Sequence, residues 1–359
     1  MKNIVCFHLF NDYSGSPKVL KTVIEGLIEK GYNVDLVTSR CGVLDELKGK
    51  ENLRLRQYSY RFSRNIAIRA MRYAWVQLLV FFIALGYLFK RNTVIYINTI
   101  LPVGAAIGGR MACKKVVYHY HENAKAKSTA YRILAKIMQL IASDIICVSQ
   151  YQRSFLRRKK RVHIVSNALC NSFVEKLSPD SDRAFEAKRV LMLGSLKGYK
   201  GTDEFITLAK RMPQYKFELV INDSQENIDK YLKEKNITPT GNLTIYPRQE
   251  DVTPFYNRSS LVLNLSNKEL FIETFGLTAL EAMAAGLPVI VPTVGGIAEM
   301  VTDGKNGFKI DVQELDKIEK AVEDILTNEK IYLSLSSNAL EKSRLYYYTQ
   351  MNEHIARVL

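Results

Sequence analysis

Two glutamates in the last third of the chain, Glu273 and Glu281, are separated by seven residues and enclose a Phe-Gly-Leu segment. If a helix begins near Phe275, Glu273 lies in the loop before it and Glu281 lies about two turns beyond Glu273. The backbone amides of Phe275, Gly276 and Leu277 would then offer unpaired N–H groups to an anion. An acid, an amide nest and a second acid in this order could bind a sugar, a diphosphate and a ribose.

The pair alone is weak evidence, because Glu281 could also be a residue on a solvated helix face. Further motifs follow the pair at definite spacing. They are G-L-P-V at 286–289, G-G-I-A-E at 295–299 and D-G-K-N-G at 303–307. Together the motifs resemble those of the retaining glycosyltransferases of family 4, densely after Arg189 and loosely before it. The resemblance implies the GT-B fold, an α/β architecture in which two Rossmann-like parallel-sheet domains face each other across a cleft. It also implies sugar transfer from a nucleotide sugar.

Apolar segments with strand character alternate with helical segments, as βαβ units require. The expected strands cover residues 4–10, 33–38, 94–98, 115–119, 145–149 and 163–167, and then 189–193, 217–222, 243–246, 261–265 and 289–291. A helix is expected over 18–30, a polar linker over 175–188 and a long helix over 331–359. We therefore expect an acceptor-side domain at 1–170 and a nucleotide-sugar domain at 186–339, with the helix at about 340–359 packing back on the first domain.

The family resemblance assigns the donor diphosphate to the segment after the strand at 189–193. Lys200 matches the family lysine, and Gly201 matches the glycine beside it. The family arginine should stand at position 195, where this chain has Ser195. Lys197 or Arg248 could supply the missing positive charge, which would stabilise the leaving nucleoside diphosphate. Alternatively, the enzyme is slow or the donor binds differently.

The first half of the chain offers an acceptor-side loop and three candidate histidines, His8, His119 and His121. Gly15 lies in a short turn after the first strand; it could permit close approach of the backbone to a ligand, or simply form a tight turn. By position it resembles the Gly-containing acceptor-side loop of the family. His119 and His121 lie in H-Y-H-E, where the family often has a histidine near the reacting sugar. His121 matches that position, while His119 reads as a core histidine and His8 has little beyond its strand-end position to support it.

The resemblance also implies a mechanism. Glu281 would bind the ribose, the amides at 275–277 and Lys200 the phosphates, and Glu273 the sugar hydroxyls. The acceptor hydroxyl would attack from the leaving-group face, so that catalysis is positioning and charge stabilisation. We expect no metal and no cofactor, with a UDP-sugar as the favoured donor substrate. Asp180 and Asp182 spell D-x-D, the metal signature of a different glycosyltransferase fold, but they lie in the expected linker.

Positive charge is concentrated in the first half of the chain. Residues 1–165 hold 28 Lys and Arg against 9 Asp and Glu, whereas residues 166–359 hold 23 against 27. Such asymmetry suggests an anionic partner for the first half. The sequence contains no nucleic-acid-binding module, so we expect an acidic membrane surface and no nucleic acid.

An apolar run at 73–89 strengthens that expectation. Arginines at 61, 64, 69 and 72 precede it, and Lys90 and Arg91 follow it. At 17 residues the run is at the lower limit for a membrane span, and the next segment reads as a strand of the same domain. It is therefore either a buried core helix or a helix that dips into lipid with its arginines at the headgroups. The basic cluster at 157–161 could share that surface or be a solvated loop.

Five scattered cysteines without paired motifs indicate a reducing compartment. The short apolar run at 4–10 is too short for a secretion signal, so we expect a cytoplasmic protein, peripheral on the inner face of the cell membrane. Transfer of a hexosyl or N-acetylhexosaminyl group to a glycan or polyprenyl-linked acceptor in surface polysaccharide synthesis is the expected function. Two alternatives are a nucleotide-sugar epimerase and a degenerate scaffold subunit, the latter supported by Ser195 alone. The sugar, the acceptor and the oligomeric state are not readable from the sequence.

Overall fold

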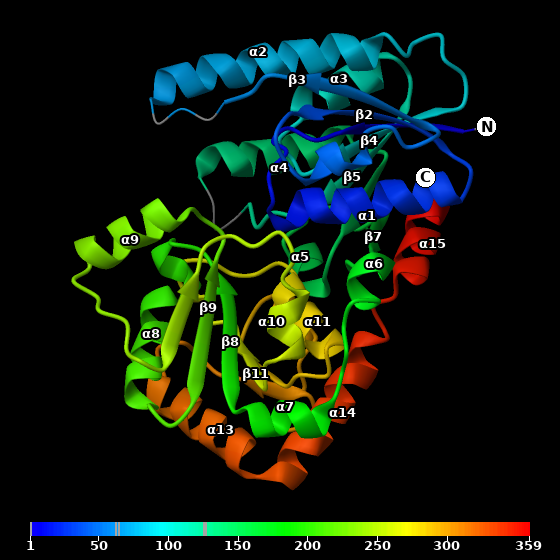
Figure 1. Cartoon of the computed structure of the whole chain (residues 1–359). Helices are drawn as coiled ribbons and strands as arrows, with labels where there is room; N and C mark the ends of the chain where they lie inside the picture. Colours follow the sequence, from blue (N-terminus) through cyan, green and yellow to red (C-terminus); the bar gives the residue numbers. More distant parts are fainter. Residues whose placement is uncertain (1, 62, 64, 125–127) are drawn as a thin grey trace. The chain divides into compact units, whose positions relative to one another are not determined.

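A computed structural model describes residues 2–61, 63, 65–124 and 128–359. Arg64, one of the arginines before the apolar run, lies outside these residues. The chain divides into two compact units, one formed by Met1–Ala168 with Tyr348–Leu359 and the other by Leu169–Tyr347. Each unit contains a parallel sheet with helices, and each is described here by itself (Figure 1).

Unit 1 is built on a seven-stranded sheet in the order β3-β2-β1-β4-β5-β6-β7, with every pairing parallel. Its strands are β1 Asn3–Phe7, β2 Asn33–Ser39, β3 Leu53–Tyr58, β4 Thr93–Asn98, β5 Lys115–Tyr120, β6 Asp144–Cys147 and β7 Val162–Ile164. Its helices are α1 Gly15–Glu29, the 3-10 helix η1 Val43–Leu47, α2 Ile66–Leu85, α3 Val103–Met111, α4 Thr129–Ile141, α5 Gln150–Ser154 and α15 Tyr348–Val358. The order reverses beside β1, which is where open α/β sheets bind ligands.

Alternate residues of β1 supply the two faces of this sheet. Val5 and Phe7 belong to a buried cluster with residues of α2, α3 and α4, whereas Ile4 and Cys6, equally buried, do not. Helices α2, α3 and α4 therefore cover one face, as expected for right-handed crossovers that run in one direction along the sheet. Helix α15 packs against α1, and the Nζ of Lys2 donates to the backbone oxygen of Leu359 at 2.6 Å.

Unit 2 is built on a six-stranded parallel sheet in the order β10-β9-β8-β11-β12-β13. Its strands are β8 Arg189–Gly194, β9 Lys216–Ile221, β10 Leu243–Tyr246, β11 Leu261–Leu263, β12 Val289–Val291 and β13 Gly307–Lys309. Its helices are α6 Asn171–Val174, α7 Ser181–Ala187, the 3-10 helix η2 Gly198–Lys200, α8 Thr202–Arg211, α9 Gln225–Glu234, α10 Thr253–Asn257, α11 Leu277–Ala284, α12 Gly296–Glu299, α13 Leu315–Thr327 and α14 Glu329–Ser343.

The expected linker at 175–188 is wrong, because most of its second half is helix α7. Asp180 is the N-cap of this helix, and its Oδ1 accepts from the backbone N–H of Arg183 at 3.0 Å. Asp180 therefore has a capping role that the linker interpretation missed. The buried residues Ala184 and Phe185 fix α7 to unit 2, and the ring of Phe185 lies 5.3 Å from that of Tyr332.

The single long helix expected at 331–359 is also wrong. It is two helices, α14 and α15, separated by residues 344–347, and they belong to different units. The break follows from packing: the ring of Tyr346 lies 5.8 Å from that of Phe275 in an edge-to-face contact. The remaining differences are smaller: β1 ends at Phe7 rather than Phe10, α1 begins at Gly15 rather than Lys18, and strands β3 and β13 were not expected.

Candidate functional site

The loop after β8 brings Lys200 to the end of β11. Gly201 has a φ of +78°, and a Cβ there would lie 2.2 Å from the backbone oxygen of Leu265. Only glycine permits this approach. As a result, the Nζ of Lys200 forms an ion pair with the Oε1 of Glu273. The same ammonium lies 4.5 Å from the centre of the Phe271 ring.

Glu273 is held by its side chain and by its backbone. The hydroxyl of Ser266 donates to its Oε1 at 3.2 Å, and the N–H of Gly296 donates to its backbone oxygen at 2.8 Å. Gly295 has a φ of +108°, and a Cβ there would lie 2.5 Å from that same backbone oxygen. The G-G-I-A-E motif therefore has a physical role, since its two glycines let the next loop approach and bind the Glu273 backbone.

Helix α11 begins at Leu277, two residues later than the sequence suggests. Its N-cap is Gly276, with a φ of +97°, and a Cβ there would lie 2.5 Å from the Cγ1 of Ile297. The Phe275 side chain is buried against Tyr346, so that residue offers its backbone rather than its ring. The first N–H groups of a helix have no partner within it, and they favour an anion.

Glu281 lies on α11 and is buried, in contrast to a residue on a solvated face. Its Oε2 accepts from the hydroxyl of Tyr256 at 2.6 Å. Burial, and then the neighbouring carboxylate, raise the pKa of Tyr256 well above its usual value, so the phenol keeps its proton and donates. Tyr256 was not predicted from the sequence. Its position in the short helix α10, within T-P-F-Y-N, gives no periodic signal.

The residues considered as replacements for the family arginine are placed differently. Lys197 is exposed, with its Nζ 5.9 Å from the Tyr199 ring, and Tyr199 stacks on Phe271 at 4.8 Å. Arg248 is also exposed and follows β10, where its N–H donates to the backbone oxygen of Asp223 at 2.9 Å. Each lysine ammonium thus lies near one ring of this aromatic pair, Lys197 near Tyr199 and Lys200 near Phe271.

Ser195 has an enclosed hydroxyl. Its Oγ makes no hydrogen bond within the part of the chain that the structure describes, although its backbone oxygen accepts from the hydroxyl of Thr202 at 3.0 Å. Buried polar atoms nearly always have a partner in a folded protein. At the position where the family has an arginine, this chain therefore has a hydroxyl that remains able to bind a ligand.

In unit 1, Asn98 joins the elements that carry the other candidate residues. Its Nδ2 lies 3.0 Å from the Nδ1 of His8 and 3.1 Å from the backbone oxygen of Ser16, and its Oδ1 lies 2.9 Å from the Nε2 of His121. Because an amide nitrogen only donates, His8 accepts at Nδ1 and His121 donates from Nε2. Asn98 ends the buried strand β4 and was not predicted from the sequence.

Gly15 is the first residue of α1 and adjoins Ser16, so the expectation that it lies in a turn before the helix is wrong. The side-chain amide of Asn98 instead binds the start of the helix through the backbone oxygen of Ser16. Glu122 is also buried, and its carboxylate accepts from the N–H of Ile100 at 3.2 Å and from the N–H of His121 at 3.3 Å.

His8, His119 and His121, at this end of the seven-stranded sheet, are held neutral. Burial lowers the pKa of His8 to about 4 and that of His119 to about 3. Burial, followed by the nearby His119 and His8, puts the pKa of His121 well below its usual value. His119 is fully buried, and its Nδ1 lies 2.6 Å from the Tyr96 hydroxyl. It is therefore a core histidine with a hydrogen-bond partner. His121 is thus a hydrogen-bonding group and not a cation.

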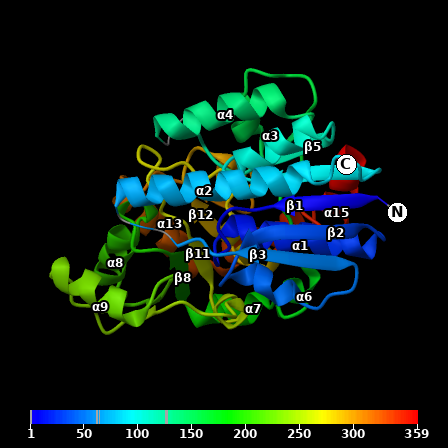
Figure 2. The same cartoon turned by 90° about the horizontal axis from the view of Figure 1, so that it is seen from above.

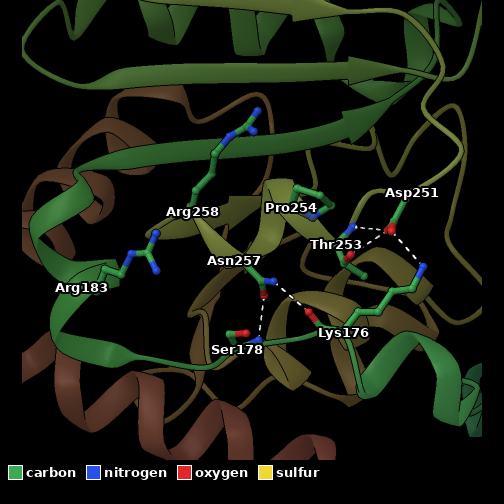
Figure 3. A pocket seen from close by; sticks show the side chains of 8 residues that line it. All are labelled: Lys176, Ser178, Arg183, Asp251, Thr253, Pro254, Asn257 and Arg258. Atoms are coloured by element: carbon green, nitrogen blue, oxygen red, sulfur yellow. Dashed lines mark hydrogen bonds and ion pairs between the residues drawn. The ribbon is translucent and has the colours of Figure 1, made fainter.

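A separate surface pocket of about 580 Å³ lies in unit 2. Eight residues line it: Lys176, Ser178, Arg183, Asp251, Thr253, Pro254, Asn257 and Arg258 (Figure 3). Lys176 pairs with Asp251 at 2.9 Å, and hydrogen bonds from Thr253 and then this lysine lower the pKa of Asp251 to about 2. The pocket includes none of the predicted site residues. Its contacts tie the segment at 176–178 to α10, which carries Tyr256.

Among the residues that the structure describes, no group of three or more His, Cys, Asp or Glu side chains is arranged to hold a metal ion. The donor set at the site consists instead of an ammonium, hydroxyls and helix amides. These are ligands for anions and for sugar hydroxyls.

Two family models match the chain in succession. Residues 13–169 match Glycosyltransferase Family 4, and residues 174–342 match Glycosyl transferases group 1. An uncharacterized glycosyltransferase of Haemophilus influenzae is 26% identical over 240 residues, which is 65% of this chain and 64% of that protein. A capsular polysaccharide biosynthesis glycosyltransferase of Staphylococcus aureus, CapM, is 23% identical over 95% of this chain and 93% of its own length.

Solved structures share the fold over nearly the whole chain. Anabaena HepE in complex with UDP and glucose matches with a TM-score of 0.78 and 20% identity, covering 99% of this chain and 98% of that one. WaaG, a glycosyltransferase of lipopolysaccharide biosynthesis, matches with a TM-score of 0.71 and 16% identity over 99% of both chains. With two parallel sheets of seven and six strands and matching family models on both halves, the chain belongs to glycosyltransferase family 4 and has the GT-B fold.

Proposed function

We propose that this protein transfers a hexosyl or N-acetylhexosaminyl group from a UDP-sugar to a hydroxyl of a glycan or polyprenyl-linked glycan, with retention of configuration, in surface polysaccharide synthesis. The observation that carries this proposal is the Lys200–Glu273 ion pair beside the N-terminus of α11, with Glu281 buried on that helix. Support for the donor comes from Anabaena HepE, solved with UDP and glucose, and support for the product comes from the capsular relative.

In this proposal unit 2 binds the donor. Lys200 and the amides at 275–277 hold the diphosphate, Glu281 holds the ribose hydroxyls, and Glu273 holds hydroxyls of the sugar. Glu281 is suited to this because Tyr256 occupies its Oε2 and fixes the orientation of the carboxylate. No metal ion or cofactor takes part, since the ammonium and the helix dipole offset the charge that develops on the leaving diphosphate.

Residues of unit 1 would serve the acceptor side. His121, neutral and oriented by Asn98, offers hydrogen bonding near the reacting sugar without adding charge. The departing diphosphate takes the proton of the acceptor hydroxyl, so the mechanism needs no histidine as a general base. Gly15 contributes through its position at the start of α1, beside the Ser16 carbonyl that Asn98 binds.

The charge of the first half supports the acceptor and the location that we propose. A net excess of 19 positive charges over residues 1–165, from 28 Lys and Arg against 9 Asp and Glu, favours contact with an anionic membrane surface. We propose that the protein acts in the cytoplasm, peripheral on the inner face of the cell membrane, where a polyprenyl-linked acceptor would be presented. This part of the proposal does not involve nucleic acid.

The decisive experiment measures binding and slow hydrolysis of UDP-, GDP- and ADP-sugars by the wild type and by Glu281→Gln. We expect one nucleotide to bind tightly and one sugar to be released, with both effects weakened in the variant. NMR of the freshly released sugar should show the donor's own anomeric configuration. Glu269→Gln, an exposed glutamate in the loop before Glu273, is the matched control and should behave as the wild type.

Two outcomes would count against the proposal. If no nucleotide sugar binds, the scaffold alternative moves ahead, with Ser195 as its decisive residue. If the released sugar first has the inverted configuration, the retaining mechanism is wrong even though the transferase assignment stands.

A further inference from the structure

Helix α2 is more apolar and more exposed than a helix of a soluble core should be. It has 20 residues and a mean hydropathy of 1.5, yet only 11% of its most apolar 18-residue stretch is buried. Of the two interpretations of the run at 73–89, the buried core helix is therefore wrong. Length and composition alone would allow this helix to cross a membrane.

The exposed side chains form a stripe along one side of α2. They are Met71, Trp75, Leu78 and Phe82, spaced by four, three and four residues, which places them on one helical face. Trp75 is 68% exposed. The buried residues Val76, Val80 and Ala84 form the opposite face and belong to the core of unit 1. The stripe consequently faces away from the sheet.

Helix α2 is fixed firmly to unit 1. A Cβ at Gly104 of α3 would lie 2.1 Å from the backbone oxygen of Gln77, and one at Gly108 would lie 2.4 Å from that of Phe81. The two glycines, four residues apart, thus bring the helix backbones into direct contact. The N–H of Gly104 also donates to the Oε1 of Gln77 at 2.8 Å. The exposed stripe therefore lies on a rigid support.

A membrane span is incompatible with the sheet. Strand β3 precedes α2 and pairs with β2, whereas β4 follows it and pairs with β1 and β5. Because β1 also pairs with β2, the segments on both sides of α2 belong to one continuous sheet. A crossing helix would separate them by the thickness of a bilayer. Helix α2 can only lie along a surface.

The neighbouring helices continue the same character. Helix α3 packs between α2 and α4, as Figure 2 shows from above. Both neighbours expose large apolar residues, which are Ile107 and Met111 on α3 and Ile133 and Leu140 on α4. The three helices contain no Asp or Glu, but they contain Arg69, Arg72, Arg110, Arg132 and Lys136, and Lys90, Arg91 and Lys114 lie at their ends.

This charge pattern favours an anionic lipid surface over a second copy of the chain as the partner of these helices. In a two-fold dimer the same face would pack on itself, so like charges would meet with no acidic residue of these helices to offset them. An anionic lipid surface supplies the opposite charge at the headgroups and an apolar layer beneath them. Single tryptophan and phenylalanine rings beside arginines suit that boundary.

We propose that the outer face of α2, extended by the exposed residues of α3 and α4, inserts its apolar side chains into the headgroup boundary of an anionic bilayer while α2 stays packed on its sheet. This inference deepens the membrane contact of the proposed function and rests on it. Insertion differs from contact through charge alone, because the apolar side chains then leave water.

Trp75 provides a direct test because it is the only tryptophan of the chain. The full-length protein is mixed with vesicles of phosphatidylcholine, or of phosphatidylcholine with phosphatidylglycerol, and its emission and co-sedimentation are measured. We expect a blue shift and binding with the mixed vesicles only. Brominated acyl chains should quench the emission, which shows that the ring reaches the apolar layer.

Matched variants separate the apolar and the electrostatic contributions. Leu78→Ser with Phe82→Ser should reduce the blue shift and the bound fraction about tenfold or more, since each substitution removes apolar area that insertion into lipid would bury. Leu345→Ser, an equally exposed leucine of unit 2, should have no effect. Lys90→Gln with Arg91→Gln should weaken binding at low salt, whereas Lys216→Gln with Lys233→Gln should not. Circular dichroism checks that every variant is folded.

Three results would overturn the inference. One is unchanged emission and no sedimentation with anionic vesicles at low salt. A second is binding without quenching of Trp75, which would mean contact through charge alone. A third is a concentration-dependent blue shift without lipid and a doubled mass, which would identify a second copy as the occupant. Donor hydrolysis is measured separately in lipid-free buffer, so a failure of the transferase assignment does not affect this readout.

Discussion

The Nζ of Lys200 and the Oε1 of Glu273 form an ion pair, although the two residues lie 73 positions apart in the chain. Both are charged groups assigned to the donor, Lys200 to the diphosphate and Glu273 to the sugar, and in the structure each offsets the charge of the other. A diphosphate that binds Lys200 must therefore compete with a carboxylate. The pair thus connects the binding of the phosphates with the release of Glu273 for the sugar.

This competition predicts opposite effects of two charge-removing substitutions. Glu273→Gln should leave UDP affinity equal or increased, because Lys200 loses its competitor, while turnover falls about 100-fold. Lys200→Met should lower UDP affinity about 10- to 100-fold, the value of a hydrogen bond to a charged group. Calorimetric titration with UDP and donor hydrolysis measure the two quantities. A similar loss of UDP affinity in both variants would contradict the competition.

Tyr256 should matter to the site as well as to the fold. Tyr256→Phe removes the hydroxyl that donates to Glu281, so we expect a loss of stability of about 1–2 kcal/mol and weaker binding of the nucleotide. Tyr332→Phe is the matched control: its hydroxyl is equally buried in unit 2 and donates to the backbone oxygen of Ser260 at 2.8 Å. The control should lose stability without losing UDP affinity. Equal affinities of both variants would remove Tyr256 from the donor site.

The buried histidines predict acid sensitivity. Their pKa values lie below the unfolded value of about 6.5, at about 4 for His8 and about 3 for His119. At pH values between the native pKa of each histidine and its unfolded pKa, the unfolded chain binds a proton that the native state does not. Stability is therefore complete above about pH 6.5 and falls as the pH drops toward 4, by up to about 1.4 kcal/mol per pH unit for each group.

Urea unfolding at several pH values between 7 and 4 tests this expectation. His119→Gln should reduce the pH slope by about one proton, whatever it does to stability at pH 7. His354→Gln, an exposed histidine of α15, is the control and should keep the wild-type slope. An unaltered slope in His119→Gln would mean that His119 does not remain neutral in the native state.

The sequence was most informative where local pattern and local structure coincide. Buried parallel strands read as continuous apolar runs, so most strands were predicted within a few residues. Lys200, Gly201 and Glu273 could be named in advance because they match local motifs of the family, and at Gly201 the structure shows why the motif needs glycine, since a Cβ there would meet the backbone of Leu265. The two-sheet GT-B fold expected from the motifs is confirmed.

What the sequence did not predict depends on contacts between distant segments. Tyr256 binds Glu281, 25 residues away, and Asn98 binds His121, His8 and Ser16, between 23 and 90 residues away, and no periodic pattern marks either residue. The break between α14 and α15 follows from packing of Tyr346 on Phe275, which propensity alone does not encode. The same holds for α2, because its apolar run would suit a core helix and only the packing shows which face remains exposed.

Ser195 allows a last prediction, since its hydroxyl is enclosed and without a partner in the described structure. Leaving a buried hydroxyl unpaired costs stability, so its removal in Ser195→Ala should leave the free protein equally stable or more stable. If the hydroxyl instead serves the diphosphate in place of the family arginine, UDP affinity should fall. We expect a fall of about 5- to 10-fold, as for one hydrogen bond to an anion.

Thr240→Val is the matched control for this substitution, because the Oγ1 of Thr240 is also enclosed without a partner and lies in the loop before β10. Both variants should be at least as stable as the wild type in urea unfolding, and only Ser195→Ala should bind UDP more weakly. Unchanged affinity in Ser195→Ala would exclude the hydroxyl as a phosphate contact. Lys197 would then be the remaining candidate to replace the charge of the missing guanidinium, because it is exposed and its ammonium lies near Tyr199, which stacks on the ring of Phe271 next to Lys200.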